Sequence, residues 1–199
     1  TNRIAGTDDM IRKFFHRLRR LFTADSIPEI IWGYTDAHGK YLPQVRISNT
    51  TFIGNKEELQ LGNHVFIGHY NMIDASNGLT IEEGCQVTNY VSILTHSSHI
   101  SIRLYGRAYI DQQDHAGYYK GSVVIGKYSF IGPHTVIMPG STIGKGCIVS
   151  AFSYVNGVFP DFSIIAGNPA VVTGDTRTLD QQYLDQHPHL KEFYNQWSQ

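Results

Sequence analysis

Two histidines and a run of tyrosines gather in one short part of the sequence. His96 and His99 stand in the stretch ILTHSSH, and the segment that follows, about 97–121, holds Tyr105, three further tyrosines, two aspartates and a third histidine. Histidine titrates near neutral pH and can take a proton from a hydroxyl group. A long segment with this content is typical of a functional loop, so we expect the chemistry of the protein to lie here.

Composition and charge narrow the class of protein. The chain has 199 residues and 41% apolar content, enough for one well-buried domain. Its 16 Lys and Arg against 17 Asp and Glu give a formal charge of -1, without the basic field that nucleic-acid binding requires. The two cysteines are too few for a disulfide framework, and no stretch resembles a membrane span or a signal peptide. We expect a cytoplasmic protein that does not bind nucleic acid.

The N-terminal stretch MIRKFFHRLRRLF, residues 10–22, is amphipathic and basic. Such a helix can lie on an anionic membrane surface. The alternative is a helix that packs on its own domain. Peripheral contact with the inner membrane is therefore one hypothesis for residues 10–22.

A sequence repeat of six residues predicts the elements that position the loop. Aliphatic residues stand at 125, 131, 137, 143, 149 and 155, and the same spacing recurs in shorter runs from residue 47 to 93. This period fits neither an amphipathic helix nor a simple strand, and it indicates a solenoid in which three hexads form one coil. The repeat breaks at about 97–121, so this segment is expected to leave the solenoid at a corner. We predict a helix and extended arm over 1–44, the solenoid over 45–172 and a helical tail over 173–199.

The hexads at 125–155, with the closing turn IIAGNPA at 164–170, resemble the hexapeptide-repeat acyltransferases. The resemblance covers about residues 45–172. It is greatest for the branch that contains galactoside, maltose, xenobiotic and surface-polysaccharide O-acetyltransferases. It implies an all-β solenoid, a left-handed parallel β-helix, that uses acetyl-CoA as acyl donor and forms homotrimers with active sites between subunits.

The family also implies a catalytic histidine at the start of the corner loop. His99 is favoured because it opens the excursion, and His96 is the alternative. Direct attack on the thioester is expected, because Cys85 and Cys147 occupy inward hexad positions where a buried thiol is inert. By resemblance, the acetyl-CoA contacts are Pro133, His134, Ala151, Asn156, Ala166 and Gly167. The polar residues expected to bind the acceptor are Asn71, Asp74, Asn89 and Tyr105, and Asp74 could instead orient the histidine.

The predicted reaction is O-acetylation of a saccharide, in a surface polysaccharide or a glycoside. One alternative is N-acetylation of an amino sugar. A zinc-dependent carbonic anhydrase shares the fold, but His64 and His69 have no third histidine on the preceding coil, so no metal site is predicted. A non-catalytic β-helix scaffold is the remaining alternative.

Overall fold

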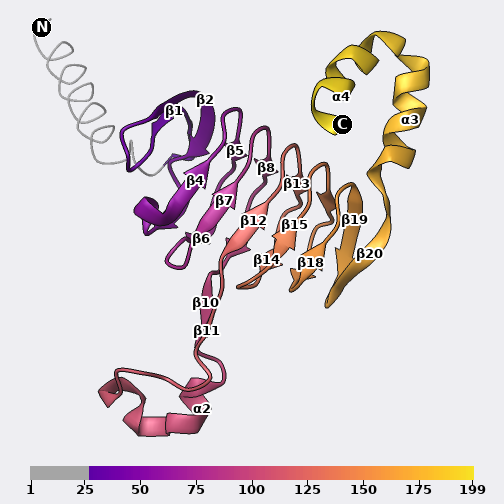
Figure 1. Cartoon of the computed structure of the whole chain (residues 1–199). Helices are drawn as coiled ribbons and strands as arrows, with labels where there is room; N and C mark the ends of the chain where they lie inside the picture. The colour runs from indigo at the N-terminus through magenta and orange to yellow at the C-terminus, as the bar shows by residue number, and fades with distance from the viewer. Residues whose placement is uncertain (1–26) are drawn as a thin grey trace, which may run out of the picture.

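The computed structural model describes residues 27–199 as a three-sided stack of short parallel strands with a lobe extending from one corner (Figure 1). The predicted N-terminal helix and its membrane contact lie outside the described residues. The left-handed parallel β-helix is confirmed, with one strand per face in each coil. Within residues 27–199, every helix is too short or too polar to span a lipid bilayer.

Each coil passes through three faces, here named A, B and C in chain order. Face A contains β2 (Tyr41–Ser48), β5 (Phe66–Ile67), β8 (Gln86–Val87), β13 (Phe130–Ile131), β16 (Ile148–Val149) and β19 (Ser163–Gly167). Face B contains β3 (Phe52–Gly54), β6 (Met72–Asp74), β9 (Ser92–Ile93), β14 (Val136–Ile137) and β17 (Tyr154–Val155). Face C contains β4 (Leu59–Leu61), which follows the short helix η2 (Lys56–Glu58), then β7 (Leu79–Ile81), β12 (Val123–Ile125), β15 (Thr142–Ile143) and β18 (Val158–Phe159).

Face A is closed at both ends by antiparallel strands. β1 (Ile30–Thr35) pairs with β2, and β20 (Ala170–Asp175) pairs with β19. Residues 30–44, the last part of the helix and extended arm predicted over 1–44, thus begin a hairpin whose second strand is already the first strand of face A. The paired edges leave fewer free backbone groups at the ends of the stack.

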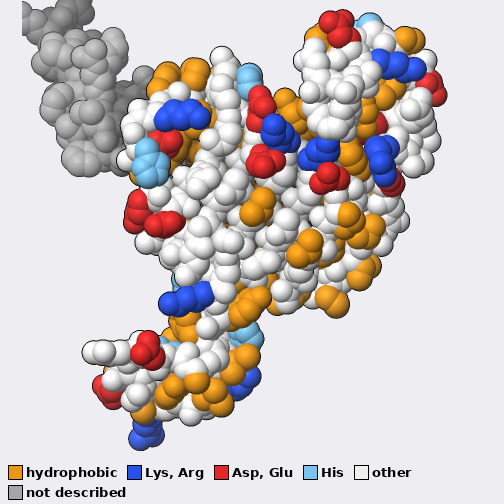
Figure 2. All heavy atoms as spheres, in the orientation of Figure 1, with side chains coloured by type: hydrophobic (Ala, Val, Ile, Leu, Met, Phe, Trp, Pro, Cys, Tyr) orange, Lys and Arg blue, Asp and Glu red, His pale blue; other side chains and the backbone are white. Residues whose placement is uncertain are grey.

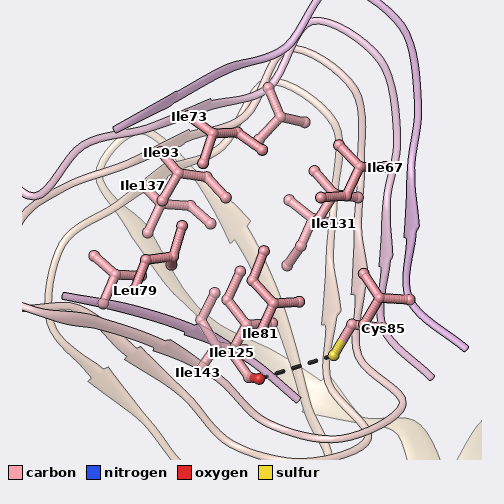
Figure 3. Packing of buried hydrophobic residues seen from close by; sticks show 14 of the residues in the cluster. Ile67, Ile73, Leu79, Ile81, Cys85, Ile93, Ile125, Ile131, Ile137 and Ile143 are labelled. Carbon is pink, nitrogen blue, oxygen red and sulfur yellow. Dashed lines mark hydrogen bonds between the residues drawn. The ribbon is translucent and has the colours of Figure 1, made fainter. Parts of the chain in front are cut away.

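The hexad positions point into the prism and form its core (Figure 3). All six aliphatic residues from Ile125 to Val155 are 0% exposed. Burying each such side chain contributes about 1.5–3 kcal/mol relative to leaving it in water. Ile47, Ile53 and Leu61 are only partly buried, because the first coil has a neighbouring coil on one side only.

The corner between faces A and B carries a stack of aromatic rings. Tyr70, Tyr90, His134 and Phe152 occupy equivalent positions in successive coils, each with a positive φ of 57–60°. The left-handed conformation is strained for bulky residues. Successive rings stack with centroids 5.3, 4.9 and 4.7 Å apart, which offsets part of that cost. We call these four residues the aromatic ladder.

The interruption of the repeat forms the lobe at the corner between faces B and C. Its neck is the antiparallel pair β10 (His96–Ser97) and β11 (Tyr119–Lys120), and its end contains α2 (Ser101–Tyr105) and η3 (Gly106–Asp111). Figure 2 shows the lobe standing away from the body on this narrow neck, with apolar side chains on its surface. The extruded corner loop is confirmed.

The tail after the solenoid folds as helices. α3 (Thr176–Gln186) begins at Asp175, whose carboxylate accepts from the Arg177 backbone N–H. The 3-10 helix η4 (Pro188–Leu190) separates it from α4 (Lys191–Ser198). Trp197 of α4 packs on Tyr128 and Phe162, which holds the tail against the corner between faces C and A.

Candidate active site

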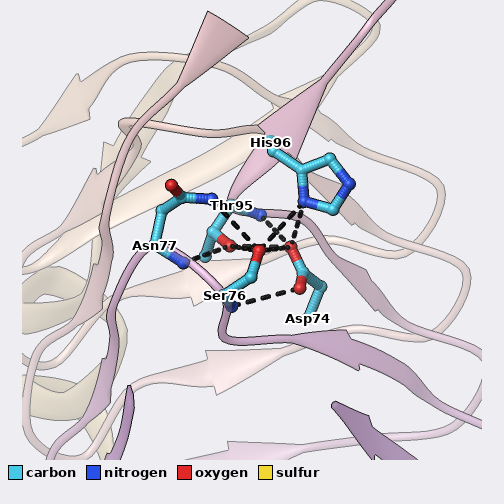
Figure 4. Close-up of polar contacts among 5 residues, drawn as sticks. All are labelled: Asp74, Ser76, Asn77, Thr95 and His96. Atoms are coloured by element: carbon cyan, nitrogen blue, oxygen red, sulfur yellow. Dashed lines mark hydrogen bonds and ion pairs between the residues drawn. The ribbon is translucent and has the colours of Figure 1, made fainter. Parts of the chain in front are cut away.

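The first residue of the neck meets the last residue of a face B strand. His96 Nδ1 lies 2.8 Å from Asp74 Oδ2, and the side chains are 40% and 13% exposed. The register aligns Ile73 with Ile93, which places Ser76 beneath His96 one coil apart. Figure 4 shows the imidazole with Nδ1 toward Asp74 and its other nitrogen, Nε2, turned away from this cluster.

Asp74 is held as a carboxylate by its neighbours. Its Oδ2 accepts from Thr95 N (3.1 Å), Thr95 Oγ1 (2.7 Å) and Ser76 Oγ (3.1 Å), and its Oδ1 accepts from Ser76 N (3.1 Å). Burial alone raises the pKa of Asp74, but the hydrogen bonds from Thr95 and Ser76 outweigh burial and lower the pKa to about 2. The group is therefore ionised at neutral pH.

Further hydrogen bonds fix the two residues that hold Asp74. Thr95 is fully buried, and its hydroxyl oxygen accepts from Asn77 N at 3.1 Å. Ser76 Oγ lies 3.1 Å from His96 Nδ1. Sequence reasoning missed Thr95 and Ser76. The 20-residue offset between stacked coils, applied to the residues around His96, would have found them.

A tyrosine just before the returning strand of the neck covers the imidazole. Tyr118 stacks on His96 with centroids 5.7 Å apart and planes 9° apart, and Lys120 Nζ lies 5.4 Å from the Tyr118 ring centroid. Burial, followed by the nearby Tyr109 and Asp74, raises the pKa of Tyr118, so its hydroxyl stays protonated at neutral pH. The ring is thus held on one side by a carboxylate and on one face by Tyr118.

This arrangement suits proton transfer. A carboxylate at Nδ1 favours the tautomer with the proton on Nδ1, which leaves Nε2 free to accept a proton. The same carboxylate stabilises the imidazolium that forms. The geometry is that of a general base oriented by an aspartate.

The second candidate histidine has a different environment. His99 is exposed, and its Nδ1 lies 2.8 Å from Ser97 Oγ. Its carbonyl oxygen accepts from the Arg103 guanidinium, which ties it to the lobe. The structure therefore brings Asp74 to His96 and not to His99, although the sequence argument favoured His99.

Two of the expected acceptor residues serve the coil itself. Asn71 is buried; its Nδ2 donates to the carbonyls of Gly68 and Thr88, and its Oδ1 accepts from Val91 N. Asn89 Oδ1 accepts from His69 N at 2.7 Å. Both amides satisfy backbone groups that the corner would otherwise leave unpaired. Their side chains are engaged in the fold.

Tyr105, the last expected acceptor residue, supports the lobe. Its hydroxyl oxygen accepts from Ala116 N at 2.9 Å, and its ring meets His115 edge-on. Asp74 alone of the four acceptor predictions lies directly beside a candidate base.

The residues expected along acetyl-CoA divide between two corners. The pairing of Ile131 with Val149 and of Val149 with Ile165 sets successive coils in register. Pro133, Ala151 and Gly167 therefore fall at equivalent positions, with His134 and Ala166 beside them. Asn156 follows β17 and lies at the corner between faces B and C. Five of the six thus lie along one corner, and three of these form a line along the stack.

Neither the cysteines nor the histidines of the first coils form a reactive cluster. Burial raises the pKa of Cys85 to about 12, and burial also raises the pKa of Cys147. His69 Nδ1 lies 2.7 Å from Ser48 Oγ, and His64 is exposed. Over residues 27–199, no three His, Cys, Asp or Glu side chains of one chain gather as metal ligands would.

Comparisons with known proteins agree with the fold. Residues 122–157 match the family of bacterial transferase hexapeptide repeats. A Mycobacterium tuberculosis protein named as an acetyltransferase is 30% identical over 66% of this chain and 44% of its own. Escherichia coli WbbJ, named as a lipopolysaccharide biosynthesis O-acetyl transferase, is 41% identical over 26% of each chain.

A solved galactoside acetyltransferase, in complex with coenzyme A, superposes with a TM-score of 0.58 at 21% identity. The alignment covers 66% of this chain and 62% of that one. This chain thus spans less than half of the mycobacterial relative and under two thirds of the solved structure.

Proposed function

We propose that this chain, which carries the hexapeptide repeat of bacterial transferases on a left-handed β-helix, is an acetyl-CoA-dependent O-acetyltransferase of saccharides with His96 as its general base. The observation that carries the proposal is the 2.8 Å contact between His96 Nδ1 and the ionised Asp74. This contact favours the proton on Nδ1, so Nε2 is free to accept a proton at the start of the corner loop.

His96 would act at both ends of the transfer. Nε2 takes the proton from the acceptor hydroxyl as the oxygen attacks the thioester carbonyl carbon, and a carbon–oxygen bond forms. When the carbon–sulfur bond breaks, the imidazolium returns the proton to the leaving thiolate. Asp74 stabilises the imidazolium in between. An acyl-enzyme on Cys85 is not part of this scheme, because a buried thiol with a raised pKa is a poor nucleophile.

The line formed by Pro133, Ala151 and Gly167 supports the acyl-donor assignment. Each lies at or just after the end of a face A strand, in successive coils. Ala151 and Gly167 are exposed, and Pro133 is half-buried. A long, extended pantetheine arm can lie along such a straight row of positions. The solved galactoside acetyltransferase was bound to coenzyme A, which supports the same donor here.

A saccharide hydroxyl is the proposed acceptor because the named relatives include a lipopolysaccharide O-acetyl transferase and a galactoside acetyltransferase. An amino-sugar acceptor would require a deprotonation step before the acyl transfer. An amine is protonated at neutral pH, so it must lose a proton before it can attack. The acceptors in the thiol-release test therefore include amino sugars.

A homotrimer with sites between subunits is part of the proposal. Large apolar side chains on and beside face B are 47–70% exposed in the single chain: Phe52, Tyr70, Met72, Tyr90 and Phe152. Exposed apolar surface of this extent is typical of a subunit interface. Sedimentation equilibrium is expected to give three times the mass of the chain, and a monomer at micromolar concentration would contradict it.

The test is thiol release from acetyl-CoA by the wild type, His96→Asn and His99→Asn, without added metal. The acceptors are glycosides, oligosaccharides and amino sugars. We expect His96→Asn to lower kcat by about 10²-fold or more, as loss of a general base does, and His99→Asn to stay within about twofold. Loss of activity only in His99→Asn would move the base to His99. No release with any acceptor would reject the function.

A further inference from the structure

A cleft of about 800 Å³ lies between the lobe and the corner that follows β6. Its walls include Ser76 and Asn77 from the solenoid and Tyr109, Asp114, Tyr118 and Lys120 from the lobe. His96 is not part of its lining. The cleft is therefore beside the candidate active site without containing the base.

The chemistry of the walls matches a neutral sugar ring. Two phenol rings line it, and an aromatic ring can pack against the C–H groups of a pyranose. The carboxylate, the amide and the ammonium group supply acceptors and donors for hydroxyl groups. The charges of Asp114 and Lys120 cancel, so the cleft has no net positive potential that would attract a phosphate or another polyanion.

The aromatic walls are held in place before any ligand arrives. The His115 ring lies 4.1 Å from the Tyr109 ring between centroids, and its Nε2 is 2.7 Å from the Tyr109 carbonyl oxygen. The Tyr118 backbone N–H donates to His115 O at 3.1 Å. A preorganised site loses less entropy when it binds.

Tyr118 is shared between the cleft and the active site. The same ring that lines the cleft stacks on His96 with 5.7 Å between centroids. Ser76, whose Oγ lies 3.1 Å from His96 Nδ1, lines the cleft as well, so a ligand there would approach the imidazole from the Nδ1 side and not at Nε2, where the acetyl group is transferred. This position suits a sugar residue joined to the one that reacts.

From this placement we propose that the cleft is a subsite for a second sugar residue, so that the acceptor is an oligosaccharide or a polymer repeat and not a monosaccharide. The inference rests on the proposed function and specifies its substrate class. Asp114 and Tyr109 are the specificity-determining residues of the subsite.

The experiment compares acceptors of increasing length: methyl galactoside with galactobiose and galactotriose, and methyl glucoside with maltose and maltotriose. The variants are Tyr109→Leu and Asp114→Asn. Asp111→Asn is the matched control, because Asp111 is an exposed aspartate of the same lobe outside the cleft lining. We expect kcat/KM for at least one series to rise about tenfold or more with the second sugar, and both cleft variants to remove that rise.

The cleft variants should leave kcat/KM for the methyl glycosides within about twofold, and Asp111→Asn should behave as wild type. No gain from the second sugar in either series, or equal losses for short and long acceptors, would overturn the proposal. If no acceptor releases thiol, saturation-transfer NMR with the same oligosaccharides separates the two hypotheses. Oligosaccharide signals lost in Tyr109→Leu would keep the subsite while the reaction fails, and no signals at all would reject it.

Discussion

Replacing Asp74 by asparagine removes one charge from the centre of the candidate site. The amide can keep its oxygen toward Thr95 and His96, and its nitrogen then faces the Ser76 N–H, which loses its acceptor. The shape of the site is thus nearly preserved. The loss of activity reports on the charge, whereas the loss of stability also contains a pH-independent part from the unpaired Ser76 N–H.

The expected loss of activity follows from the imidazolium. At about 4 Å between charge centres and an effective dielectric of about 20, an ion pair is worth about 4 kcal/mol, which corresponds to roughly 10²–10³ in rate after partial screening. We expect kcat to fall by about that factor. Since acetyl-CoA binding does not use Asp74 in this scheme, KM for acetyl-CoA should change little.

The expected loss of stability follows from the pKa of Asp74. The pKa falls from an ordinary 3.8 to about 2 on folding. A depressed carboxyl pKa stabilises the folded state above the unfolded pKa, and the contribution is lost as pH falls through the folded pKa. At pH 7 it amounts to about 2 kcal/mol, and at pH 3 to roughly half of that.

Urea unfolding at pH 7 and pH 3, combined with thiol release, tests both parts. The variant should unfold more easily than wild type at pH 7, and the difference should shrink at pH 3. His96→Asn is the control, because it removes the base and leaves the Asp74 carboxylate with Thr95 and Ser76. Wild-type kcat in Asp74→Asn would refute the role of the charge. An unfolding difference that is the same at both pH values would refute the contribution of the charge to stability.

Two further predictions concern the core. Ile131→Ala, at a fully buried hexad position, should lower the free energy of unfolding by about 2–5 kcal/mol in urea, whereas the exposed Gln86→Ala on the adjacent strand should stay within about 0.5 kcal/mol. Equal effects would contradict the inward assignment of the hexads. Cys85, whose pKa burial raises to about 12, should not react with a thiol reagent at pH 8 until urea unfolds the chain, and rapid labelling of the native protein would disprove this.

The solenoid was predictable because its cause is local and repeated. Each inward position, such as Ile131 or Ile137, needs an aliphatic side chain, so the spacing of six residues is visible in the amino-acid sequence. The break at 97–121 was visible for the same reason, since a segment without the period cannot continue the stack. The burial of Cys85 also followed from its place within a hexad.

The partner of each polar residue was decided by stacking between coils. Asp74 and His96 are 22 residues apart, and their contact depends on the 20-residue offset that brings Ser76 beneath His96. Tyr118 reaches the same ring only because β10 and β11 pair in one particular register. The hexad pattern was therefore enough to predict the three-sided solenoid and the position of the lobe. The tertiary structure selected His96 over His99, because only the stacked coils set a carboxylate beside one of the two.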